Sequence, residues 1–128
     1  MLASLSRYEP QTRGILRIVA GLMFLSHGLV KLVGFPEGAP PGEQPVLSLL
    51  WVAGIIELIT GSLITIGWFT RLAALIASGE MAVAYWMIHG SKSLYPVVNM
   101  GEAAVLYCFL FLYFVTAGPG AWSVDRRR

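Results

Sequence analysis

Residues 46–69 read VLSLLWVAGIIELITGSLITIGWF, and this stretch decides the fold. Glu57 is its only ionisable residue, and polar and apolar side chains do not alternate along it. A helix needs roughly 17–25 mostly apolar residues to span a bilayer, whereas a half-buried strand alternates with a period of two. The stretch therefore predicts a membrane-spanning helix.

Three further apolar stretches extend this reading to the whole chain. We expect membrane-spanning helices over residues 14–33, 46–69, 72–88 and 97–117. The first ends at Gly34-Phe35-Pro36, and the last ends at Gly118-Pro119-Gly120, where glycine and proline interrupt helices. The sequence predicts one all-α domain over residues 1–128, an integral membrane four-helix bundle.

The composition excludes several classes of protein. Of 128 residues, 56% are hydrophobic and only 12% are charged, too few to cover the surface of a small soluble domain. Cys108 is the single cysteine, which excludes an internal disulfide and a paired-cysteine redox motif. A formal net charge of +2 gives no reason to expect nucleic acid as a partner. The expected environment is the lipid bilayer.

The basic residues predict the orientation. With four spans, Arg7, Arg13, Arg17, Arg71 and residues 126–128 lie on one side of the membrane. The opposite side carries Glu37, Glu43 and Lys92. Because lysine and arginine concentrate in cytoplasmic segments, both termini are expected in the cytoplasm, with the protein in a bacterial inner membrane.

Polar residues inside the spans carry most of the functional information. A charge at the centre of a bilayer costs about 2.5–3.5 kcal/mol, so such residues usually face the bundle interior. Glu57 and Glu80 share helix faces with small residues, which favours close helix packing. We expect one polar pocket with more carboxylates than a low-dielectric site can hold ionised. Its candidate residues are His27, Lys31, Glu57, Glu80, Asn99 and Glu102.

Structural explanations of these residues stay open at this point. Lys31 can extend to the outer interface, His27 can act in helix packing, and a lone glutamate can be a neutral hydrogen-bond donor between helices. His89 is expected to point away from the face of Glu80. No metal site is expected, because the sequence has two histidines and no Glu-x-x-His motif.

The motifs resemble those of a known family. The stretch from Gly21 to Pro36 reads GLMFLSHGLVKLVGFP, a later stretch from Asn99 reads NMGEAAVLY, and the end reads GPGAWSVD from Gly118. Together with Glu57, Gly61, Gly67 and Thr70-Arg71, these stretches resemble the DoxX family of bacterial inner-membrane proteins over nearly the whole chain. The positions that match the family are His27, Lys31, Glu57 and Glu102.

The resemblance implies a four-helix membrane fold and links to quinone-coupled oxidation of sulfur compounds or to membrane oxidoreductase complexes. Two functions follow as alternatives: a membrane subunit of a quinone-linked oxidoreductase complex, or a non-catalytic scaffold for a redox partner. A small transporter or proton path is a third alternative. Quinone is the one cofactor expected, the partner is a membrane, periplasmic or cytoplasmic redox protein, and self-association is compatible with so small a bundle. Catalysis by this chain itself stays an open question at this level.

Overall fold

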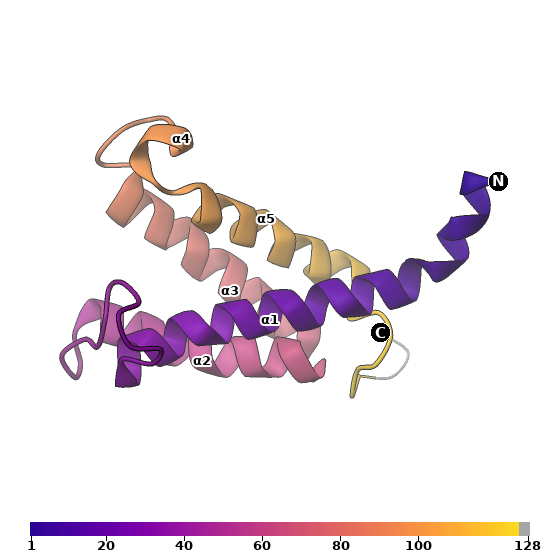
Figure 1. Ribbon diagram of the computed structural model, residues 1–128, viewed down its shortest axis with the longest axis horizontal. Helices are drawn as coiled ribbons and strands as arrows, with labels where there is room; N and C mark the ends of the chain where they lie inside the picture. Colours follow the sequence, from indigo (N-terminus) through magenta and orange to yellow (C-terminus); the bar gives the residue numbers. More distant parts are fainter. Residues whose placement is uncertain (126–128) are drawn as a thin grey trace.

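The computed structural model describes residues 1–125, whose regular structure is entirely helical (Figure 1). A 3₁₀ helix, η1, precedes five α-helices, of which α4 has only four residues, and a π-helical turn, η2, extends α3. The elements are η1 (Leu2–Tyr8), α1 (Glu9–Val33), α2 (Leu49–Ile66), α3 (Thr70–Ala84), η2 (Tyr85–His89), α4 (Pro96–Asn99) and α5 (Glu102–Ala117). The prediction of an all-α fold is confirmed.

Three of the helical segments are long and apolar enough to cross a membrane: Leu2–Val33, Leu49–Ile66 and Thr70–His89. The fourth apolar helix, α5, is shorter. The segment from Leu49 to Ile66 is narrower than the predicted 46–69, since Ser48 caps its start and Gly67 ends it with a positive φ of 73°.

The prediction of a single helix over residues 97–117 is wrong. It is divided into α4 and α5, and Met100 between them has a left-handed φ of 64°. The Asn99 side chain explains the break, because its Oδ1 accepts a hydrogen bond from the Gly101 N–H at 2.8 Å. Asparagine side chains that bind nearby backbone groups compete with helical hydrogen bonds.

The helices form two closely packed pairs, α1 with α2 and α3 with α5, joined through contacts between α2 and α3. Figure 1 shows the pairs close together at the end that holds both marked ends of the chain, and diverging toward the opposite end. Phe24, Ile64, Phe111 and Phe114 are fully or almost fully buried and form the centre of the hydrophobic core.

Two glycines bring α1 and α2 into close contact. A Cβ atom added to Gly21 would lie 2.4 Å from Thr65 Oγ1, and one added to Gly61 would lie 2.7 Å from the Leu25 backbone nitrogen. Neither distance is compatible with a real side chain. Small residues allow membrane helices to approach in this way, so larger residues at either position would push the pair apart.

Arg17 is fully buried, although the sequence reading placed it in a cytoplasmic flank. Its guanidinium donates hydrogen bonds to the backbone carbonyls of Ile64 at 2.9 Å, Ala121 at 3.0 Å and Trp122 at 2.8 Å, and to that of Pro119. An arginine has five N–H donors in one plane, which suits several converging carbonyls. Arg17 thereby holds the segment that follows α5 against α1 and α2.

Asp125 completes this attachment at the start of α3. Its carboxylate accepts hydrogen bonds from the Phe69 N–H at 3.0 Å and the Thr70 N–H at 2.8 Å. The first N–H groups of a helix have no partner within the helix, and a carboxylate there is also favoured by the helix dipole. The motif that begins at Gly118 is thus a folded segment that closes one end of the bundle.

We predict that Arg17→Met lowers the free energy of unfolding by more than about 3 kcal/mol, because buried carbonyls lose a charged donor. Thermal unfolding of the purified protein in detergent measures this loss. Arg71 is the matched control: it is exposed and donates to the Val115 and Thr116 carbonyls, so Arg71→Met should cost less than about 1 kcal/mol. Equal losses in the two variants would contradict the special role of Arg17.

Candidate functional site: a cavity between the helix pairs

A cavity of about 940 Å³ lies between the two helix pairs, with lining residues from α1, α2, α3 and α5. Most of its lining is apolar and includes Leu49, Ile56, Ile76 and Met81. Pro40, Pro41 and Lys92 from the connections at the diverging end also contribute to the wall. This shape and composition are typical of sites for small apolar ligands with a few polar groups.

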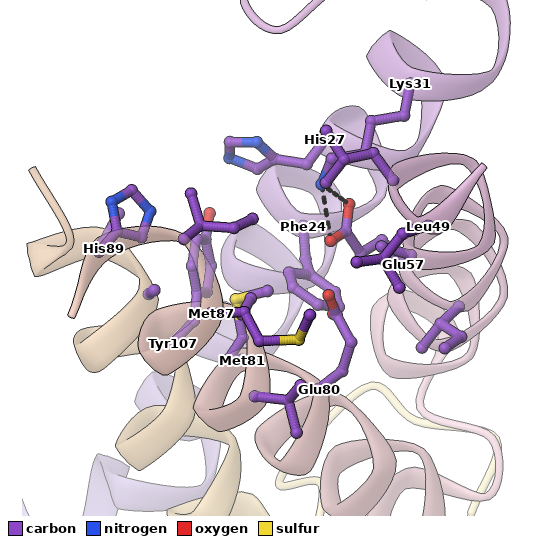
Figure 2. Close-up of a pocket in the computed structure, with 18 of the residues that line it drawn as sticks. Phe24, His27, Lys31, Leu49, Glu57, Glu80, Met81, Met87, His89 and Tyr107 are labelled. Carbon is purple, nitrogen blue, oxygen red and sulfur yellow. Dashed lines mark hydrogen bonds and ion pairs between the residues drawn. The ribbon is translucent and has the colours of Figure 1, made fainter. Parts of the chain in front are cut away.

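An ion pair between α1 and α2 forms the polar wall of the cavity. Lys31 Nζ lies 2.6 Å from Glu57 Oε1 and 2.8 Å from Oε2, and Figure 2 shows both contacts. Glu57 is fully buried, and the side chain of Lys31 is 12% exposed. Lys31 therefore turns into the bundle instead of extending to the outer interface. Because each charged group is the partner of the other, the ion pair lowers the free-energy cost of placing these two charges inside the bundle.

Glu80 adds a second carboxyl group from α3. It lies near enough to both Glu57 and Lys31 for their charges to interact, and Figure 2 shows its side chain extending toward the pair. Its Oε1 atom is buried and has no hydrogen-bond partner among residues 1–125. Both oxygens of Glu57 bind Lys31, whereas the Oε1 atom of Glu80 remains available for a ligand or a proton.

His27 and Tyr107 face each other from α1 and α5, with ring centroids 6.0 Å apart. Both line the cavity, and both also line a smaller groove between the same two helices. Tyr107 is only 8% exposed, and its hydroxyl has no hydrogen-bond partner in the described part of the chain. Sequence reasoning missed Tyr107. The available signal was a hydroxyl within the apolar run of α5.

His89 lines the same cavity as Glu80, so the prediction that it points away is wrong. The π-helical turn of η2 begins after Glu80 and includes His89, and it contains one more residue per hydrogen-bonded turn than an α-helix. Extrapolation at 100° per residue therefore fails beyond Tyr85. His89 Nδ1 lies 3.0 Å from the Asn99 carbonyl oxygen, which fixes the ring at the diverging end of the molecule.

Asn99 and Glu102 do not line the cavity. The buried Asn99 amide donates hydrogen bonds to Tyr85 Oη and the Ser93 carbonyl, both at 2.9 Å, and so holds the connection between η2 and α5. Glu102 is exposed at the first residue of α5, where a carboxylate is favoured by the helix dipole. Of the six candidate residues, the structure brings together His27, Lys31, Glu57 and Glu80.

This arrangement can bind a neutral molecule and exchange protons with it. Most of the wall is apolar, while Glu80 Oε1 and Tyr107 Oη are two buried polar atoms without hydrogen-bond partners among residues 1–125. Carboxyl, imidazole and phenol groups are all able to act as acids or bases when they lie within reach of the reacting atoms.

Comparison with protein families matches residues 13–90 to DoxX. The chain is 44% identical to a protein of Haemophilus influenzae named "Uncharacterized protein", over 97% of this chain and 96% of that protein. It is 32% identical to the inner membrane protein YphA of Escherichia coli, over 88% of this chain and 87% of the relative. An uncharacterized membrane protein of Mycobacterium tuberculosis, Rv3486, is 24% identical over 88% and 78%. No solved structure matches the chain with significant similarity.

We predict that Lys31→Met destabilises the protein by about 3–5 kcal/mol, because Glu57 is left as a buried charge without its partner. Combining Lys31→Met with Glu57→Gln should restore most of this loss, as the double variant contains no unpaired charge. Lys92→Met, which removes an exposed lysine, is the control and should leave stability unchanged. Thermal unfolding in detergent provides all values. A double variant less stable than Lys31→Met would contradict the proposed pairing.

Proposed function

The chain belongs to the DoxX family, and we propose that it binds a quinone within the membrane as a subunit of an oxidoreductase complex. The observation that carries the proposal is the large apolar cavity with ionisable side chains on its wall. Its volume lies within the usual 300–1,000 Å³ of small-molecule sites. A quinone ring is flat, neutral and soluble in lipid, and its two carbonyl oxygens accept hydrogen bonds.

The side chains of the cavity suit the proton chemistry of a quinone. Reduction of a quinone to a quinol consumes two electrons and two protons. In the proposed complex, Glu80 donates a proton to one carbonyl oxygen, and His27 or His89 lies on the same cavity to supply another. Glu57 is less suited to this role because both of its oxygens bind Lys31.

The electrons must come from a partner. With a single cysteine, the chain has no dithiol pair, and its sequence contains no recognisable flavin motif. The proposed partner is therefore a redox protein in the membrane or at one of its surfaces, which passes electrons to the bound quinone. This chain contributes the binding site and the protons.

A non-catalytic scaffold for a redox partner is the second candidate function. It is favoured by the polar groups that the fold itself satisfies: Arg17 is bound by carbonyls, Lys31 by Glu57, and Asn99 by Tyr85 and Ser93. A scaffold would need these groups for stability only. Glu80 Oε1 and Tyr107 Oη distinguish the two functions. Both atoms are buried without a hydrogen-bond partner among residues 1–125, so a purely structural role does not explain their presence.

We predict that the purified protein carries a quinone, detectable by solvent extraction and chromatography. Gly79 lines the cavity, and a Cβ added there would meet no atom within 4 Å. Gly79→Phe should therefore place a ring in the cavity without distorting α3, and should remove the quinone from a protein that still folds. An intact quinone content in this variant would locate the quinone elsewhere.

Gly79→Ala is the matched control for the same position. A methyl group leaves most of the cavity open, so the quinone content should match that of the wild type. Replacing glycine by alanine within a helix stabilises it by about 1 kcal/mol, so both variants should unfold at or above the wild-type temperature. Absence of quinone from wild type, together with wild-type complex assembly by Gly79→Phe, would favour the scaffold.

We further propose an inner-membrane location with both termini in the cytoplasm. The segments that carry Arg7, Arg13 and Arg71, namely η1 and the starts of α1 and α3, lie at the end of the molecule that holds the marked chain termini (Figure 1). The connection between α1 and α2, which carries Glu37 and Glu43, lies at the other end. Residues 126–128, which contribute to the basic tail, lie outside the described residues.

A reporter that is active only in the cytoplasm should be active when fused after Arg128, and silent when inserted at Gly42. Gly42 suits the insertion because it belongs to the connection between α1 and α2 and to neither helix. Activity in cells measures the orientation directly. The reversed pattern would overturn the orientation, and a periplasm-specific reporter at the same two positions is the control.

A further inference from the structure

A groove between α1 and α5 lies beside the cavity on the apolar surface of the protein. The two helix backbones remain apart, and aromatic side chains bridge them: Phe24 contacts Tyr107 and Phe111, with ring centroids 5.4 Å and 4.8 Å apart. Next to Tyr107 of this aromatic bridge lies a groove of about 300 Å³. Its walls are Leu16, Val19 and Met23 from α1, and Leu106 and Leu110 from α5.

The groove and the cavity meet at the same side chains. His27, Ala103 and Tyr107 line both spaces, so the two are adjacent on either side of these residues. Val19, Met23 and Leu106 are between 49% and 69% exposed, which places the outer side of the groove on the surface that faces hydrocarbon. A molecule could therefore extend from the lipid to the cavity without crossing water.

The Tyr107 hydroxyl lies at this junction and provides an independent sign of a ligand. The residue is more than nine-tenths buried, yet its hydroxyl has no hydrogen-bond partner among residues 1–125. Across the cavity, Glu80 Oε1 is a second buried polar atom without a partner in that range. Buried polar atoms are nearly always hydrogen-bonded, and the two together match a ligand head with polar atoms on both sides.

The charges of the cavity determine the class of head group. Lys31 is paired with Glu57, and Lys92, the other lysine of the wall, is exposed in the connection after η2. Among residues 1–125, Lys31 is the cation whose charge reaches Glu80, and its pairing with Glu57 leaves it unsuited to bind a phosphate or a carboxylate there. Glu80 in its proton-donating form is neutral, so it adds a hydrogen-bonding group to the cavity and no positive charge to balance an anionic head. The head group that fits is neutral and forms hydrogen bonds.

We infer that the groove between α1 and α5 holds the hydrocarbon chain of a neutral, hydrogen-bonding lipid whose head lies between Tyr107 and Glu80. This inference rests on the proposed function for the identity of that lipid as a quinone. It adds the access route, from the bilayer between α1 and α5, and the residues that select a ligand with a chain. His27 and Tyr107 form the threshold between chain and head (Figure 2).

Photolabelling of the full-length protein in phosphatidylcholine vesicles tests the inference. The first probe is a benzoquinone with a diazirine at the end of a ten-carbon chain, and the second is a primary alcohol with the same labelled chain. We expect saturable labelling of Val19, Met23 or Leu106, which excess unlabelled decyl-benzoquinone reduces strongly. Leu22 is the control, as it is exposed on α1 and lines neither space, so its labelling by bulk lipid contact should not be competed.

The two probes separate the inference from the proposed function. Saturable labelling of the groove by the alcohol alone would support the groove as a lipid site and overturn the quinone proposal. Saturable quinone labelling confined to the α2 and α3 side, at Ile56 or Ile76, would support quinone binding and overturn the groove. Labelling that is not saturable with either probe would mean annular lipid only and would overturn the inference.

Substitutions supply a second measurement. Val19→Trp should fill the groove and weaken binding of decyl-benzoquinone about tenfold, while binding of the chainless benzoquinone stays unchanged. Leu22→Trp is the matched control and should change neither affinity. Tyr107→Phe retains the ring contacts but removes the hydroxyl, and should weaken both quinones about fivefold. Equal loss of both quinones in Val19→Trp would overturn the assignment of the chain to the groove.

Discussion

The ion pair between Lys31 and Glu57 determines what the cavity can bind. It joins α1 to α2 at 2.6 Å and 2.8 Å, and it neutralises the lysine on the inner wall. Breaking such a pair leaves a buried charge, so both partners must be present or both must be absent. Because Lys31 is occupied, Glu80 remains as the carboxyl group that can act on a ligand, and a neutral head group follows from that.

At the end of the bundle that holds the chain termini, hydrogen bonds from Arg17 and to Asp125 hold the helices together. Arg17 donates to carbonyls of α2 and of the segment after α5, and Asp125 caps the first N–H groups of α3. These bonds tie the two helix pairs together where the termini lie, and the pairs diverge toward the other end (Figure 1). Among residues 1–125, no comparable set of hydrogen bonds joins the two pairs at the diverging end, and the cavity lies between the pairs there.

A membrane subunit and a scaffold make different use of the same polar residues. In a scaffold, Arg17, Lys31, Glu57 and Asn99 stabilise the helices, and the geometry of all four fits that role. The quinone proposal depends on Glu80 and Tyr107, the two residues of the cavity wall whose buried polar atoms, Oε1 and Oη, have no hydrogen-bond partner among residues 1–125. Orphaned polar atoms in an apolar surrounding are costly, and a ligand that satisfies them supplies a physical reason for their presence.

The sequence by itself determined the helical membrane class, three of the long spans and the inward placement of Glu57 and Glu80, because apolar run length and helical periodicity are local properties. These local patterns do not fix the directions of Lys31 and His27. Only the tertiary structure decided which charges pair, since the contact of Lys31 with Glu57 depends on how two helices pack. It also decided the positions of Asn99, Glu102 and His89, because a side-chain cap at Gly101 and a π-helical turn at Tyr85 break the periodicity used for the prediction. Arg17 escaped the sequence reading for the same reason: its partners are the carbonyl of Ile64 in α2 and three carbonyls more than a hundred residues away, and no local pattern encodes them.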